Sequence, residues 1–140
     1  MMMYKPIATA LRRAKIASGG EMSRVMLALK TVLVDADDIG TFIFDEIDTG
    51  VSGRTARKVG EKMRFLGSKR QILCITHLPQ IAAMADSHFL IQKETADSQT
   101  ITHVTPLTEE GSVAEVARLM GGSDVTETTL AAARELISEK

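Results

Sequence analysis

The sequence has few cysteines and few aromatic residues. Among its 140 residues there are one cysteine, no tryptophan, one tyrosine and four phenylalanines. The single cysteine, Cys74, excludes a disulfide framework within the chain and is typical of a reducing cytoplasm. It lies inside an apolar run, where we expect it to be buried. The small number of aromatic side chains gives no indication of a surface that stacks on nucleic-acid bases.

Long apolar runs and a strong net charge are also absent. No apolar segment approaches the roughly 20 residues that a membrane helix needs, so we predict no membrane partner. Arg12 and Arg13 follow the N-terminal methionines, but Lys5 and Pro6 interrupt the stretch between them and no hydrophobic region follows, which excludes a secretory signal. The formal net charge is −1, so the chain has no overall basic field of the kind that attracts nucleic acid.

The composition is otherwise ordinary for one globular domain, but one stretch is unusual. The chain is long enough for a core, and 44% of its residues are hydrophobic. Residues 42–44 form an apolar run that predicts a buried strand, and Asp45, Glu46 and Asp48 follow it. Acidic side chains at the carboxyl end of a strand lie at the rim where open α/β sheets bind ligands. We therefore place a candidate site here.

A glycine-rich segment precedes this strand. Ser18 and Glu21 have the spacing of a capping box, and apolar residues then recur at helical spacing from Met22 to Leu33. The predicted helix has Gly19 and Gly20 in its first turn, where each glycine costs about 1 kcal/mol relative to alanine. Either the glycines let a phosphate approach the helix N-terminus, or they only form a turn behind a cap. These residues alone leave both interpretations open.

A second strand brings a histidine to the same rim. After a helix that is expected to end near Gly67, residues 71–76 predict a second buried strand. Strand, helix and strand with short connections predict two parallel strands. Because the carboxyl ends of parallel strands share one edge of the sheet, His77 is expected near Asp45 and Glu46.

The rest of the sequence predicts small elements around this unit. A short helix is expected over residues 78–84, and residues 88–93 and 100–106 predict two strands around a polar turn. A helix around residues 113–120 stops at two glycines, and residues 124–127 have a capping pattern before a last helix. The expected fold is α/β, with a parallel sheet core, flanking helices and a small C-terminal strand pair.

Adjacent carboxylates after an apolar strand suit phosphoryl transfer. The first, Asp45, can support Mg²⁺, and the second, Glu46, can orient or deprotonate the attacking water. The alternative is a charged pair at the rim, although carboxylates this close repel one another without a cation or ligand. His77 could instead be a core histidine. With Asp45 it could also bind a transition metal, but no second histidine or cysteine lies at ligand spacing.

Four motifs resemble those of the ABC ATPases, in the same order. Residues 17–21 (Ala-Ser-Gly-Gly-Glu) resemble the signature motif, and residues 42–46 (Phe-Ile-Phe-Asp-Glu) resemble the Walker B strand. Residues 48–53 (Asp-Thr-Gly-Val-Ser-Gly) resemble the D-loop region, and residues 75–77 (Ile-Thr-His) resemble the switch-histidine motif. The resemblance implies the head of a P-loop NTPase of the ABC type.

Longer strings are similar to the RecN family of SMC-like ABC ATPases, which act in DNA double-strand break repair and recombination. The strings are residues 17–30, 43–53 and 74–86, together with the Leu-Met-Gly-Gly at 119–122. We therefore divide the chain into an unmatched lead-in, residues 1–15, and the C-terminal portion of an ATPase head, residues 16–140.

The resemblance also implies roles for the matching residues. Asp45 would support Mg²⁺, Glu46 would be the catalytic base toward water, and His77 would contact the γ-phosphate of ATP. Asp48 would line an interface with a second head. The residues that would meet ATP held by that second head are Ser18, Gly19, Gly20 and Glu21.

The chain has no Gly-x-x-x-x-Gly-Lys-Ser/Thr motif, so it lacks a P-loop to hold the phosphates. We therefore expect ATP hydrolysis only together with a P-loop-bearing N-terminal segment and a second head, and an isolated chain that is inactive. DNA as a partner and a place at the nucleoid follow from the resemblance alone. The alternative function is a non-catalytic head-pairing interaction module or a degenerate fragment.

Overall fold

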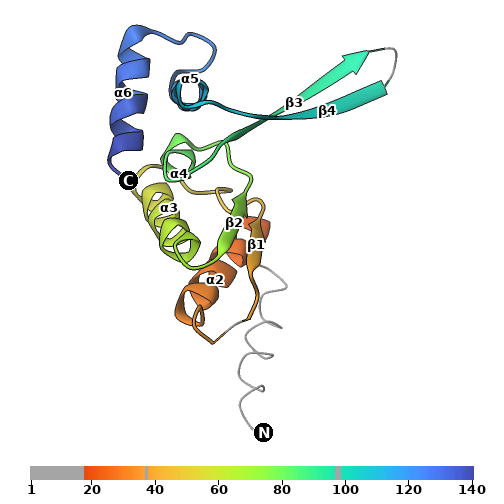
Figure 1. Ribbon diagram of the computed structural model, residues 1–140, viewed down its shortest axis with the longest axis vertical. Helices are drawn as coiled ribbons and strands as arrows, with labels where there is room; N and C mark the ends of the chain where they lie inside the picture. The colour runs from red at the N-terminus through yellow and green to blue at the C-terminus, as the bar shows by residue number, and fades with distance from the viewer. Residues whose placement is uncertain (1–17, 37, 97–98) are drawn as a thin grey trace, which may run out of the picture.

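The computed structural model describes residues 18–36, 38–96 and 99–140 (Figure 1). The predicted lead-in, residues 1–15, lies outside them. In chain order, the elements are α2 (Gly19–Val32), β1 (Thr41–Phe44), α3 (Gly53–Gly67), β2 (Gln71–Cys74), α4 (Pro79–Ala82), β3 (Phe89–Ala96), β4 (Gln99–Pro106), α5 (Glu109–Gly121) and α6 (Glu127–Ser138). This order confirms the predicted α/β fold. Within the described ranges, no helix is long and apolar enough to cross a membrane.

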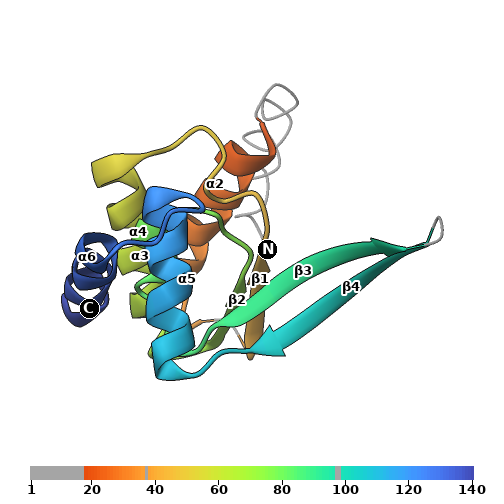
Figure 2. The same ribbon diagram turned by 90° about the horizontal axis from the view of Figure 1, so that it is seen from above.

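The strands form two separate pairs. β1 and β2 are parallel and pair in register from Thr41–Gln71 to Phe44–Cys74, as the strand–helix–strand pattern predicted. β3 and β4 are antiparallel and form a hairpin that extends away from the helices (Figure 2). The C-terminal strand pair is therefore also confirmed, with longer strands than the sequence indicated.

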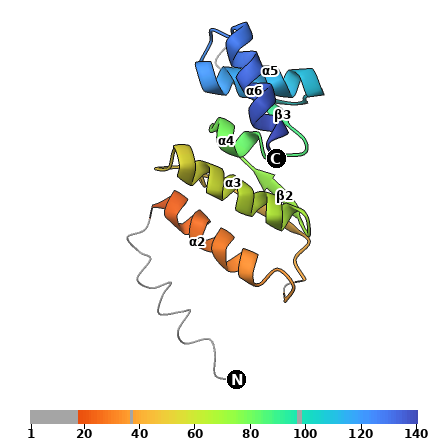
Figure 3. The ribbon, with the colours of Figure 1, turned by 90° about the vertical axis from the view of Figure 1, so that its left-hand side faces the viewer.

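The parallel pair is covered on one face by α2 and α3. These helices lie side by side against it (Figure 3), and their apolar side chains form the first hydrophobic cluster with Phe42 and Phe44. The other face is exposed: the side chain of Ile43 is 70% exposed, and Leu73 and Ile75 are also exposed. The strands were predicted to be buried, and this holds for one face of the pair only. Alternate residues of a strand point to opposite faces, and only one face is covered by the described residues.

A second hydrophobic cluster lies between α4, α5 and α6. Its buried residues are Ala82, Val113, Val116, Ala117 and Ala133. α5 stops where predicted, at Gly121, and Gly122 adopts a φ of 77° that favours glycine. The start of the last helix differs from the prediction.

The N-cap of α6 is Thr126, not Asp124, where the predicted capping pattern begins. Its side chain accepts a hydrogen bond from the backbone N–H of Thr129, and the Thr129 hydroxyl accepts one from the backbone N–H of Thr126. The N-cap differs from the prediction because Thr126 and Thr129, three residues apart, make the two reciprocal hydrogen bonds of a capping box.

Candidate functional site

The site begins at the N-terminus of α2, where the predicted capping box is present. The backbone N–H of Ser18 donates to the Glu21 carboxylate (2.8 Å), and the backbone N–H of Glu21 donates to the Ser18 hydroxyl (3.3 Å). The Ser18 hydroxyl also donates to the Glu21 carboxylate (3.2 Å). The hydrogen bonds that this carboxylate accepts from Ser18, first from the backbone N–H and then from the hydroxyl, lower the pKa of Glu21 below its usual value. The Glu21 side chain is therefore engaged in holding the helix start.

The two glycines let this helix start approach the loop after β1. A Cβ atom on Gly20 would lie 2.7 Å from the backbone oxygen of Glu46 and 2.9 Å from atoms of Thr49. A Cβ atom on Gly19 would overlap the Glu46 carboxylate. The close approach that the glycines permit in this structure is therefore to the chain's own loop, and it places the signature residues beside Glu46.

Asp45 and Glu46 follow β1 directly and are both exposed. Glu46 has a φ of 56°, in the left-handed region that residues other than glycine rarely adopt. Its backbone N–H donates to the Asp45 carboxylate (2.8 Å), and its carbonyl accepts from the N–H of Thr49 (3.0 Å). The next side chain, Ile47, is completely buried and anchors this turn in the first hydrophobic cluster.

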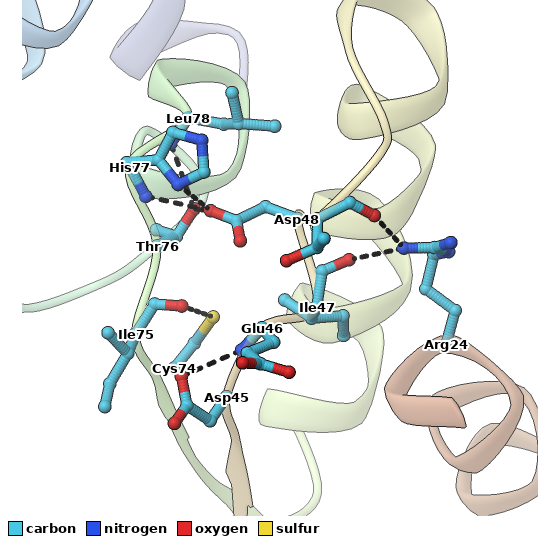
Figure 4. Close-up of polar contacts among 11 residues, drawn as sticks. Arg24, Asp45, Glu46, Ile47, Asp48, Cys74, Ile75, Thr76, His77 and Leu78 are labelled. Carbon is cyan, nitrogen blue, oxygen red and sulfur yellow. Dashed lines mark hydrogen bonds and ion pairs between the residues drawn. The ribbon is translucent and has the colours of Figure 1, made fainter. Parts of the chain in front are cut away.

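Two side chains of α2 bind the backbone of the loop that follows β1. The guanidinium of Arg24 donates to the backbone oxygen of Ile47 (3.1 Å; Figure 4) and to that of Thr49 (2.8 Å). The Ser23 hydroxyl donates to the backbone oxygen of Asp45 (2.8 Å). Sequence analysis assigned no role to either residue. The only available signal was that two polar residues interrupt an otherwise apolar part of the helix.

Asp48 points away from Asp45 and Glu46, toward the residues that follow β2 (Figure 4). Only 5% of Asp48 is exposed. One of its carboxylate oxygens, Oδ2, accepts from the Thr76 hydroxyl (2.7 Å) and from the backbone N–H of His77 (2.9 Å), and it lies 2.9 Å from Nδ1 of the His77 ring. The resemblance implied that Asp48 lines an interface between heads. In this structure its carboxylate contacts its own chain.

Cys74 lies at the end of β2, close to this group, and is half-buried. Burial, and secondly the charges of Asp48 and Asp45, raise the pKa of its thiol to about 12. The thiol therefore stays protonated at neutral pH and is not an activated nucleophile. The expectation of a buried cysteine holds only in part, because Cys74 packs against the first hydrophobic cluster but stays partly exposed.

The arrangement suits a cation that is held jointly with phosphate. Within the part of the chain that the structure describes, no group of three or more His, Cys, Asp or Glu side chains is placed to hold a metal ion by itself. Mg²⁺ normally takes one or two protein carboxylates and completes its shell with water and phosphate oxygens. The exposed carboxylate of Asp45 fits that type of site.

The structure thus brings the predicted residues to one end of the strand pair. The signature glycines adjoin Glu46, and Asp48 joins this loop to His77. The residues that the sequence did not single out are Ser23, Arg24 and Thr76, which position the backbone around the group.

Comparison with known proteins adds close relatives. The chain is 50% identical over 126 residues to the DNA repair protein RecN of Bacillus subtilis and 52% identical over 124 residues to RecN of Treponema pallidum. RecN of Vibrio cholerae is 47% identical over 124 residues. These matches cover 89–90% of this chain and 22% of each relative, so the chain spans about a fifth of their length. No model of a protein family matches it.

A solved structure shares the fold. It comes from work on ATP-driven dimerization and DNA-stimulated activation of SMC ATPases. The TM-score is 0.54 at 20% sequence identity, and the match covers 76% of this chain and 64% of that chain. Together, these comparisons show that the chain matches the C-terminal part of the DNA repair protein RecN and shares part of the fold of a solved SMC ATPase structure.

Proposed function

We propose that this chain is the C-terminal part of an ATP-hydrolysing head of the RecN type, acting in DNA double-strand break repair and recombination. The observation that supports this most is the grouping of the signature residues, Asp45, Glu46 and His77 at the carboxyl end of two parallel strands. This is the edge where α/β sheets bind ligands. DNA, a second head and the P-loop-bearing N-terminal segment are the partners that this function requires, in the cytoplasm at the nucleoid.

The carboxylates after β1 would divide the chemistry of hydrolysis. Asp45 would hold Mg²⁺, which neutralises charge on the phosphates when it is bound. Glu46 would orient the attacking water and accept its proton. Within the described residues, no hydrogen bond or ion pair engages the Glu46 carboxylate, so it is free to contact water. The carboxylate lies beside Gly19 of the signature residues.

The N-terminus of α2 would contribute from the other side of a head pair. Ser18, Gly19 and Gly20 would meet the γ-phosphate of ATP that the second head holds, and Glu21 would stabilise that helix start. A helix N-terminus favours an anion, because its first N–H groups are unpaired within the helix and its dipole is positive there. His77 would contact the γ-phosphate bound by its own head.

The test uses a complete protein in which this chain follows a P-loop-bearing head segment. Changing Glu46→Gln should reduce the rate of ATP hydrolysis at least about 100-fold, the scale on which a general base contributes. ATP binding should remain. The matched control is Glu110→Gln, the same substitution on an exposed residue of α5 outside the site, which should leave turnover intact. Unchanged turnover in Glu46→Gln would remove this residue from the proposed role.

The isolated chain provides a second test. Without a P-loop it should show no ATP hydrolysis above background. Robust hydrolysis that is abolished by Glu46→Gln would contradict the need for an N-terminal segment. A complete protein that pairs through its heads but never hydrolyses ATP would instead favour the non-catalytic interaction module.

A further inference from the structure

A single carboxylate oxygen connects the loop after β1 with the segment after β2. Oδ2 of Asp48 lies 2.7 Å from the Thr76 hydroxyl, 2.9 Å from the backbone nitrogen of His77 and 2.9 Å from Nδ1 of the same histidine. Asp48 is 5% exposed, whereas the His77 side chain is 73% exposed. The buried carboxylate therefore holds one edge of a ring whose opposite edge faces solvent (Figure 4).

The direction of each hydrogen bond follows from the chemistry of its partners. The backbone N–H of His77 can only donate. The Thr76 hydroxyl accepts from the backbone N–H of Leu78 (3.1 Å), and its own hydrogen is directed to Asp48. Oδ2 is therefore an acceptor in both contacts. Nδ1 faces the same oxygen at 2.9 Å, so it must carry a proton, because otherwise two lone pairs would face each other.

We propose that Asp48 is a positioning residue that fixes the Nδ1–H form of His77 and leaves Nε2 as the outward-facing atom. A carboxylate that accepts from Nδ1–H sets both the tautomer and the orientation of an imidazole ring. Asp48 also fixes the backbone that carries this ring, because it binds the N–H of His77 and the hydroxyl of Thr76. The ring and its attachment point are held by one buried group.

The consequence for phosphate contact rests on the proposed function. With Nδ1–H directed to Asp48, Nε2 is the ring atom left to meet a phosphate. Ionised phosphate oxygens only accept hydrogen bonds, so the ring that contacts them carries protons on both nitrogens. Asp48 then lies behind that positive ring as a fixed negative charge. The resemblance assigned Asp48 to a surface between heads, whereas this geometry gives it a role inside one head.

The chain contains a second histidine–carboxylate pair that serves as an internal comparison. Nε2 of His103 lies 3.5 Å from the Glu94 carboxylate, and both side chains are mostly exposed, 53% and 76%. Each of these residues belongs to a strand of the hairpin, where the two are not directly opposite. A solvated pair at that distance should leave His103 in the mixture of tautomers that a free imidazole has.

The experiment is nitrogen-15 NMR of the histidine rings in this 140-residue chain at about pH 8, above the ordinary imidazole pKa of about 6.5. A proton on Nδ1 of His77 is expected, whether or not Nε2 also carries one. A neutral His77 ring protonated only at Nε2 would overturn the proposal. This result needs no variant, no ATP and no partner, so it is independent of whether the chain takes part in hydrolysis.

The Asp48→Ala variant then tests the cause. It removes the acceptor that faces Nδ1, so neutral His77 should lose its preference for the Nδ1–H form and take up the mixture of tautomers that a free imidazole has. The matched control, Glu94→Ala, should leave the His77 signals unchanged. A predominant Nδ1–H form that persists in a folded Asp48→Ala chain would overturn the role of Asp48. If this variant does not fold, the wild-type spectrum still decides which nitrogen carries the proton.

Discussion

The two hydrophobic clusters of the chain are surrounded by different kinds of polar contact. Around the first cluster, side chains bind groups that are distant in sequence. Arg24 reaches the backbone of Thr49, 25 positions away, and Asp48 reaches Thr76, 28 positions away. These contacts join α2 and the two loops that follow β1 and β2. The candidate site lies where they meet.

Around the second cluster, side-chain contacts are mostly local. The Thr108 hydroxyl accepts from the N–H of Gly111 at the start of α5, and Arg118 pairs with Glu115 one turn earlier. A long-range ion pair, between Arg57 and Glu139, ties the end of α6 to α3. This region therefore consists of helices that are each specified by neighbouring residues and then packed together.

The difference explains where the candidate site lies. A site needs groups from several segments in fixed relative positions, and the first region has most of the side chains that fix one segment against another. Substitutions there should disturb several elements at once, whereas substitutions in the second region should act on one helix. The predictions below test this contrast from the largest expected effect to the smallest.

Phe44→Ala should cause the largest loss of stability. Phe44 is 5% exposed in the first cluster, and truncating a buried phenylalanine costs about 3–5 kcal/mol in the free energy of unfolding. Ile43→Ala, on the adjacent residue with 70% exposure, should change it by no more than about 0.5 kcal/mol. Urea unfolding of the chain measures both. If both substitutions lowered the free energy of unfolding by similar amounts, the exposed face of the strand pair would have to be covered in solution.

Arg24→Ala should cost about 1.5–3 kcal/mol, because it removes charged hydrogen bonds to two backbone oxygens of the loop after β1. The effect should reach beyond α2, with faster amide hydrogen exchange at Thr49. The control is Arg54→Ala, which removes an exposed arginine of α3 and should have little effect on stability or exchange. Exchange that increases only within α2 would contradict the role of Arg24 in holding this loop.

Gly20→Ala should cost about 1–3 kcal/mol in spite of the better helix propensity of alanine, because the added methyl would press on Glu46 and Thr49. The matched substitution Gly40→Ala adds a methyl where no atom lies within 4 Å and should have a smaller effect. Thermal unfolding compares the two. A Gly20→Ala chain as stable as the wild type would show that the helix start does not need this close approach.

Thr126→Ala should have the smallest effect, about 1 kcal/mol, through loss of the cap of α6. Amide exchange should increase in the first turn of α6 and leave the loop after β1 unchanged. Asp124→Ala provides the control, since the structure places the cap two residues later, and it should change stability by less than about 0.5 kcal/mol. A larger loss of stability in Asp124→Ala than in Thr126→Ala would show that Asp124 is the N-cap, as the sequence predicted.

The sequence predicted best what neighbouring residues decide. The end of β1 at Phe44, the capping box of Ser18 and Glu21, and the stop of α5 at Gly121 all agree with the structure. Each depends on backbone preferences and on hydrogen bonds between residues a few positions apart. The parallel pairing of β1 and β2 also followed, because a short strand–helix–strand connection favours that arrangement. The resemblance to ABC ATPases added the candidate roles of Asp45, Glu46 and His77, which remain predictions.

Only the tertiary structure decided how the acidic residues after β1 differ. Sequence alone presents Asp45, Glu46 and Asp48 as one cluster at a sheet rim. In the folded chain, Glu46 has an unusual backbone angle and an exposed carboxylate, whereas Asp48 turns inward to Thr76 and His77. The sequence thus determined that carboxylates follow the strand, because strand and turn propensities are local. Their orientation depends on partners about 30 positions away, which become neighbours only when α2, β1, α3 and β2 pack together.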